Sequence, residues 1–122
     1  MEEPTTYTFS FASDDAALCG EVFGLLAMEG HKVHMVNHSG DWQAEWSEHA
    51  AASDRVVQFL SAAYETNPYT NIESGFLYML FSSQLKVVTV DLRGRPPRAP
   101  AELVREIRAA APAKLALGGA VV

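Results

Sequence analysis

The chain has 122 residues, of which 48% are hydrophobic and 20% charged, with a formal net charge of −6 and one cysteine. This length suits a single domain, which buries roughly two thirds of the surface that its unfolded chain exposes. A single cysteine excludes an internal disulfide framework. No apolar run approaches the ~18 residues of a membrane span, so we expect no membrane-spanning segment.

The charge is unevenly distributed along the chain. Residues 1–85 carry twelve acidic and two basic side chains, whereas residues 86–122 carry seven basic and three acidic ones. Because an acidic surface repels phosphate groups, we expect no binding to nucleic acid and none to an anionic membrane. The first four residues, Met-Glu-Glu-Pro, lack the basic and then apolar order of a signal peptide, so we expect a cytoplasmic protein.

In chain order, segments with strand periodicity alternate with segments of helical periodicity. The first strand is predicted at residues 7–11, where aromatic side chains alternate with Thr and Ser. Apolar residues at helical spacing over 18–26 predict a helix, and Gly30 supplies its stop. We expect a second strand over 33–36 and then a turn at 38–41.

The second half of the chain continues this alternation. Trp42, Trp46 and Ala50 lie four residues apart and predict a short helix. Residues 55–60 predict an apolar strand, and we expect a polar loop over 64–69. The remaining predicted segments are a helix with Ile72, Phe76, Met79 and Leu80, a strand over 85–92, a loop over 94–100, a helix from Pro100 with Leu103, Val104 and Ile107, and an apolar tail over 115–122. That tail is interpreted as an edge strand or as the frayed end of a domain.

This order of elements predicts one α/β domain over residues 1–122. Strands that alternate with helices pair in parallel through right-handed crossovers and form an open sheet covered on both faces. Ligands of such sheets lie at the carboxyl ends of the strands, near a switch in strand order. Ligand-binding residues are therefore expected after the first three strands, at residues 10–14, 37–42 and 61–73.

Two common phosphate chemistries are excluded by the residues after these strands. The first strand is followed by no Gly-x-Gly-x-x-Gly pattern, and the chain contains no P-loop. Asp14 and Asp15 follow the first strand as in a phospho-receiver domain, but Ser61 stands where the phosphorylatable Asp would end the third strand.

The histidines and the cysteine are expected to be structural. His31 and His34 are three residues apart, a spacing that places them on opposite faces of a strand. No cluster of Cys or Asp completes a coordination shell, so we predict no metal site. We interpret His31, His34, His38 and His49 as surface or rim histidines, and Cys19, between apolar neighbours, as a buried thiol.

Three segments carry a more specific pattern. The first is Tyr7–Asp15, a strand that ends in aromatic, small and acidic residues. The second is the Ser-Gly-Asp-Trp sequence at 39–42. The third joins residues 53–64, a strand that runs into Ser-Ala-Ala-Tyr, to residues 67–73, which open a helix with an aromatic residue and then Glu. In this order the chain resembles a TIR (Toll/interleukin-1 receptor) domain of the bacterial type, over roughly residues 5–92.

The resemblance implies a flavodoxin-like three-layer sandwich of about five parallel strands with helices on both faces. It implies either an NAD glycohydrolase or cyclase that cleaves the nicotinamide–ribose bond in bacterial immune or cell-death signalling, or a noncatalytic adaptor that binds other TIR domains. A nucleoside glycosyl-transfer enzyme that uses the same carboxylate is a further alternative. The partners implied are NAD, as substrate rather than cofactor, and further copies or other TIR domains. The charge distribution then predicts salt-sensitive, head-to-tail contacts between acidic residues of 1–85 and the basic end from Arg93 to Arg108.

In the enzymes of this family, the Glu that opens the helix after the third strand is catalytic, and this position matches Glu73. Cleavage builds oxocarbenium character on the ribose, which a carboxylate stabilises. Nicotinamide leaves as a neutral molecule, so no general acid, metal or bound cofactor is required. The expected substrate-binding residues are Ser10 and Ser13, for ribose or phosphate, and Phe11, Trp42 and Tyr69, for stacking on a ring.

Structural roles for the same residues stay open at this point. Thr70 and Glu73 have the spacing of a capping box, with Thr70 as the N-cap and Glu73 at the third helical position. Trp42 and Trp46 are alternatively one face of a helix that packs on the sheet, and Phe11 is alternatively a core residue.

Overall fold

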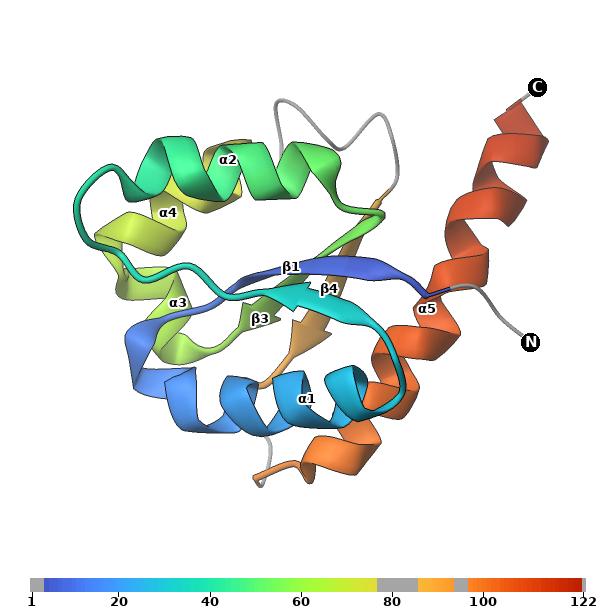
Figure 1. The fold of residues 1–122 in the computed structure, drawn as a ribbon, viewed down its shortest axis with the longest axis horizontal. Helices are drawn as coiled ribbons and strands as arrows, with labels where there is room; N and C mark the ends of the chain where they lie inside the picture. Colours follow the sequence, from blue (N-terminus) through green and yellow to red (C-terminus); the bar gives the residue numbers. More distant parts are fainter. Residues whose placement is uncertain (1–3, 77–85, 94–96, 122) are drawn as a thin grey trace.

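The computed structural model describes residues 4–76, 86–93 and 97–121, in which strands and helices alternate as predicted (Figure 1). In chain order the elements are β1 (Thr6–Ser10), the 3-10 helix η1 (Ser13–Asp15), α1 (Ala16–Met28), β2 (Lys32–His34), α2 (Trp42–Ala52), β3 (Arg55–Leu60), α3 (Ala62–Thr66), α4 (Pro68–Phe76), β4 (Val87–Asp91) and α5 (Pro100–Val121).

The four described strands form one parallel sheet in the order β2-β1-β3-β4. Helices α1 and α5 cover one face of this sheet, and α2 and α4 lie over the other (Figure 1). The predicted α/β class with parallel strands is confirmed, and the arrangement is consistent with a flavodoxin-like sandwich. The described part of the chain supplies four strands where the resemblance implies about five.

Strand β1 separates two different interiors. Its residues Tyr7 and Phe9 are buried in the apolar core beneath α1 and α5, together with Cys19 and Leu103. The intervening Thr8 and Ser10 are also fully buried, because they face the layer of α2 and α4. Buried hydroxyls must find hydrogen-bond partners, and that of Thr8 lies 2.6 Å from the Ser53 hydroxyl. The predicted alternation is therefore correct, but neither face of the strand is open to water.

Helix α2 is anchored by Trp46, which is 1% exposed in a second apolar cluster with Val56 and Ala50. The Trp46 indole N–H donates a 3.1 Å hydrogen bond to the carbonyl oxygen of Phe9. The pairing of β1 with β2 ends at Thr8, so the Trp46 indole binds the first β1 carbonyl beyond the residues that pair with β2. The prediction that Trp46 packs on the sheet is confirmed.

Several boundaries differ from the sequence-based expectations. The loop expected over 64–69 was wrong, since α3 ends at Thr66 and α4 begins at Pro68. The tail expected as an edge strand or frayed end instead continues α5 to Val121. Strand β2 ends at His34, two residues earlier than predicted. The remaining predicted positions Met79, Leu80, Leu85 and residues 94–96 lie outside the described residues.

Among the helices that the structure describes, none combines the length and the apolar character needed to cross a membrane.

The indole hydrogen bond of Trp46 gives a stability prediction. Trp46→Phe leaves the Phe9 carbonyl without its donor and a void beside the sheet, so we expect a loss of about 1–3 kcal/mol in the free energy of unfolding. Urea denaturation followed by circular dichroism measures it. Glu48→Gln, at an exposed position of the same helix, is the control and should change stability by less than about 0.5 kcal/mol. An unchanged midpoint for Trp46→Phe would contradict this description of the α2 anchor.

Candidate active site

The strand order reverses around β1, and this reversal defines the site. The chain passes from β1 to β2 on one side and then returns to β3 on the other side of β1. In open α/β sheets the two diverging connections leave a crevice at the carboxyl ends of these strands. Ser10 is the last residue of β1, and its hydroxyl is in hydrogen-bond contact with Tyr64 and Glu73, which follow β3.

The turn between α3 and α4 directs Glu73 towards Ser10. The Asn67 side-chain oxygen accepts hydrogen bonds from the backbone N–H groups of Tyr69 (2.8 Å) and Thr70 (3.3 Å) and so caps α4. The Thr70 hydroxyl donates to the Tyr64 carbonyl at 2.6 Å. The predicted capping box was therefore wrong, because α4 begins at Pro68 and the Glu73 carboxylate binds elsewhere.

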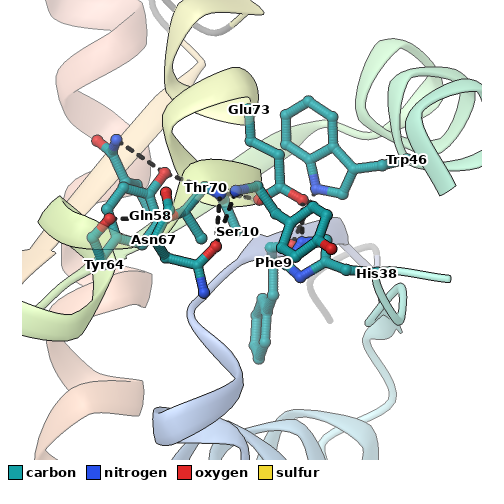
Figure 2. Close-up of polar contacts among 10 residues, drawn as sticks. Phe9, Ser10, His38, Trp46, Gln58, Tyr64, Asn67, Thr70 and Glu73 are labelled. Carbon is teal, nitrogen blue, oxygen red and sulfur yellow. Dashed lines mark hydrogen bonds and ion pairs between the residues drawn. The ribbon is translucent and has the colours of Figure 1, made fainter.

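Glu73 is buried, with 1% of its surface exposed, and both of its carboxylate oxygens have partners. Oε1 accepts a 2.6 Å hydrogen bond from the Ser10 hydroxyl. Oε2 lies 2.7 Å from Nε2 of His38, whose side chain is 10% exposed. Figure 2 shows the carboxylate between these two residues, which come from β1 and from the segment after β2. Both oxygens of the buried Glu73 carboxylate are therefore within hydrogen-bond distance of a partner.

A chain of hydrogen bonds leads to this carboxylate from β3. The Gln58 amide donates to the Tyr64 hydroxyl at 3.0 Å, and the Tyr64 and Ser10 hydroxyl oxygens are 2.6 Å apart. Because Ser10 donates its proton to Glu73, the Tyr64 hydroxyl donates to Ser10. All three donors therefore point towards Glu73, and such aligned bonds strengthen one another.

Burial and hydrogen bonding act in opposite directions on Glu73. Removal from water raises the pKa of its carboxyl, and this effect exceeds the lowering by the Ser10 and His38 hydrogen bonds and by the charge of His38. Burial likewise raises the pKa of the Tyr64 hydroxyl above its usual value. A buried carboxyl with a raised pKa and a basic neighbour is typical of functional sites.

Two predicted aromatic residues meet at His38. The Tyr69 ring stacks on the His38 imidazole, with centroids 5.1 Å apart and an angle of 12° between the planes. The Trp42 ring makes T-shaped contacts with both of these rings. Its centroid lies 4.7 Å from that of the His38 imidazole and 5.5 Å from that of the Tyr69 ring. Tyr69 is 43% exposed and so reaches the surface. Beside Trp42 lies a hollow of about 460 Å³, lined by Gly40, Asp41, Trp42, Gln43, Ala44 and Ser47.

The structure thus brings together four of the six predicted site residues: Ser10, Trp42, Tyr69 and Glu73. The other two lie elsewhere. Phe11 is buried in the core cluster under α1 and α5, which agrees with its alternative structural role. Ser13 is exposed at the start of η1.

Sequence reasoning missed His38 and Tyr64. His38 was interpreted as a rim histidine, although it lies within residues 37–42, after the second strand, where the topology predicts ligand-binding residues. Tyr64 was placed in a loop, whereas Ser61 caps α3 by accepting from its backbone N–H at 3.1 Å. The prediction for Cys19 is confirmed, since it is fully buried and burial raises the pKa of its thiol.

No three His, Cys, Asp or Glu side chains within residues 4–76, 86–93 and 97–110 are grouped so that they could hold a metal ion.

No protein-family model and no curated protein matches the chain.

The raised pKa of Glu73 gives a prediction about stability and pH. The folded state binds this proton more tightly than the unfolded chain does. The contribution of Glu73 is therefore favourable at low pH and is lost as the pH rises above about 4.3, the ordinary pKa of a glutamate.

Gln at position 73 keeps the shape and hydrogen-bonding capacity without a buried charge. We expect Glu73→Gln to be more stable than the parent at pH 7.5, by about 1 kcal/mol, and equally stable near pH 4. Urea denaturation at both pH values measures the difference, with Glu48→Gln as a control for an exposed glutamate. A less stable Glu73→Gln at pH 7.5 would be evidence that the buried charge is already fully compensated.

Proposed function

We propose that this protein is a TIR-type, flavodoxin-like NAD glycohydrolase that cleaves the nicotinamide–ribose bond with Glu73 as the catalytic carboxylate. The observation that carries this proposal is the buried Glu73 side chain at the switch point of the sheet, with one oxygen held by Ser10. The resemblance of the chain to bacterial TIR domains supports the same position on independent grounds.

The chemistry of bond cleavage fits one well-positioned carboxylate. As the C1′–N bond of NAD lengthens, positive charge develops on the ribose ring and nicotinamide leaves as a neutral molecule. A carboxylate that accepts hydrogen bonds from ribose hydroxyls is drawn close to this charge and stabilises it. The low-dielectric surroundings of Glu73 strengthen that interaction, because little water competes with it.

The contacts of Glu73 indicate how the ribose would bind. Ser10 holds Oε1 from β1, the centre of the sheet, so this oxygen stays in place. Oε2 is held by His38, which comes from the segment after β2. A ribose hydroxyl would replace the His38 imidazole at Oε2, and the rings of Trp42 and Tyr69 would then flank the base.

Self-association is the second part of the proposal. Two basic residues of the carboxyl-terminal end form exposed ion pairs, Arg93 with Glu65 and Arg108 with Glu29. Pairs of this kind are worth ~0–1 kcal/mol. They can therefore exchange for contacts with acidic residues of a second copy, which supports a head-to-tail arrangement.

Nicotinamide release tests the enzymatic proposal. Concentrated protein is incubated with NAD, with and without a crowding agent, and nicotinamide is followed by chromatography. We expect Glu73→Ala and Glu73→Gln to lower the rate by on the order of 100-fold or more, because each removes the charge that stabilises the transition state. Glu48→Gln, an exposed glutamate on α2, should leave it unchanged.

The Gln variant keeps the test valid where the Ala variant folds poorly. Equal rates for parent and Glu73→Gln would remove Glu73 from the catalytic step. No release by the parent protein at high concentration would overturn the NAD proposal and favour the noncatalytic TIR module.

Sedimentation velocity tests self-association. We expect oligomers at high protein concentration in ~50 mM salt and monomers in ~500 mM salt, because screening shortens the range of ionic contacts. Charge reversal by Arg105→Glu, at an exposed position of α5, should shift the low-salt distribution towards monomer. A monomer under all of these conditions contradicts the association.

A further inference from the structure

The imidazole next to Glu73 is not required for the cleavage of NAD. Nicotinamide departs as a neutral molecule, so its release requires no proton donor. Yet His38 lies 2.7 Å from the carboxylate and is 10% exposed, with Tyr69 stacked on one side of its ring and Trp42 in T-shaped contact with it. These contacts fix the orientation of the ring, with Nε2 directed at the carboxylate.

A proton donor matters for a different class of ribosides. In a purine ribonucleoside the base is uncharged, and breaking the C1′–N9 bond leaves an anion unless the base is protonated. A positioned general acid accelerates such steps by typically 10²–10⁴-fold. A site that has a ribose-stabilising carboxylate and an imidazole side by side contains both groups that this hydrolysis needs.

We propose that His38 is a general acid and that this site hydrolyses purine ribonucleosides as well as NAD. The inference rests on the proposed function, in that Glu73 stabilises the charged ribose in both reactions. It adds a second catalytic residue and a second substrate class, the neutral N-ribosides.

The atoms of this reaction balance with water as the only co-reactant. The ribose hydroxyls take Oε2 of Glu73, and the freed imidazolium turns to the base. His38 donates its Nε2 proton to N7 of the purine as the C1′–N9 bond breaks, and the bonding electron pair goes to the base. Water attacks C1′ and its proton returns to His38. The products are ribose and the neutral purine.

The neighbours of His38 fit a purine ring. Tyr69 is exposed enough to exchange its stack on the imidazole for a stack on a base, and its ring lies at 85° to that of Trp42. A base that takes the place of the imidazole against Tyr69 stacks on this aromatic ring and lies beside His38. Binding of the purine would therefore place its N7 within reach of the His38 imidazole.

Two substrates that share a ribose and differ in their leaving group test the proposal. Nicotinamide riboside carries a cationic base and needs no acid, whereas inosine carries a neutral base and does. The full chain and three variants, His38→Gln, His38→Ala and Glu73→Gln, are assayed on both by chromatography of the released base, after circular dichroism confirms that each is folded. Gln at position 38 keeps an N–H donor for Glu73 but has no proton to transfer.

We expect release of hypoxanthine by the parent protein. His38→Gln should lower kcat/KM for inosine about 100-fold or more and that for nicotinamide riboside less than about 3-fold, whereas Glu73→Gln should impair both. Equal losses on both substrates in His38→Gln would overturn the proposal, because His38 would then only position Glu73.

The two proposals fail in different ways. Cleavage of nicotinamide riboside without cleavage of inosine overturns the role of His38 and leaves the NAD activity standing. Cleavage of inosine without cleavage of nicotinamide riboside or NAD overturns the NAD activity and leaves the role of His38 standing. Cleavage of neither overturns both.

Discussion

The burial of one carboxylate is the constraint on which the rest of this structure depends. Glu73 is 1% exposed, and a charge in that position is tolerated only where hydrogen bonds replace the lost water. Ser10 and His38 occupy its two oxygens, and the hydroxyl of Tyr64 and the amide of Gln58 stand behind Ser10. Burial still raises the pKa of this carboxyl, so the compensation is partial. The fold thus holds the Glu73 carboxylate in surroundings that stabilise its negative charge less well than water does.

The layout of the sheet follows from this requirement. Strand β1 presents Tyr7 and Phe9 to an apolar core, and it presents the hydroxyls of Thr8 and Ser10 to the opposite layer, where they lie beside the apolar cluster of α2. An apolar residue in place of Ser10 would fill the space beneath α4 but leave Oε1 of Glu73 without a donor. Packing alone does not explain these polar side chains, and the ribose site that we propose would give them a role.

Much of the fold could be predicted from local patterns, and less of the site could. Periodicity was sufficient for β1, α1, α2 and β3, because each has one apolar face of regular spacing. The pair α3 and α4 was missed in part, since Ser61 and Asn67 cap two short helices inside a stretch that looks polar and irregular. Glu73, Trp42 and Tyr69 were predicted through the resemblance rather than through physical patterns. His38 was not, because a lone histidine in a loop carries no signal until the fold places a carboxylate beside it.

The state of Glu73 with a sugar ligand is the most direct test of this explanation. NMR of protein labelled with ¹³C at glutamate side chains follows the Glu73 carboxyl during a pH titration, with and without ADP-ribose, and Glu73→Gln assigns the resonance. Burial predicts that the pKa of Glu73 lies above the ordinary glutamate range without ligand, and the proposed function predicts a changed titration when ADP-ribose displaces His38 from Oε2. An ordinary titration that ADP-ribose leaves unchanged would contradict the assignment of Glu73 as a buried, sugar-binding carboxylate.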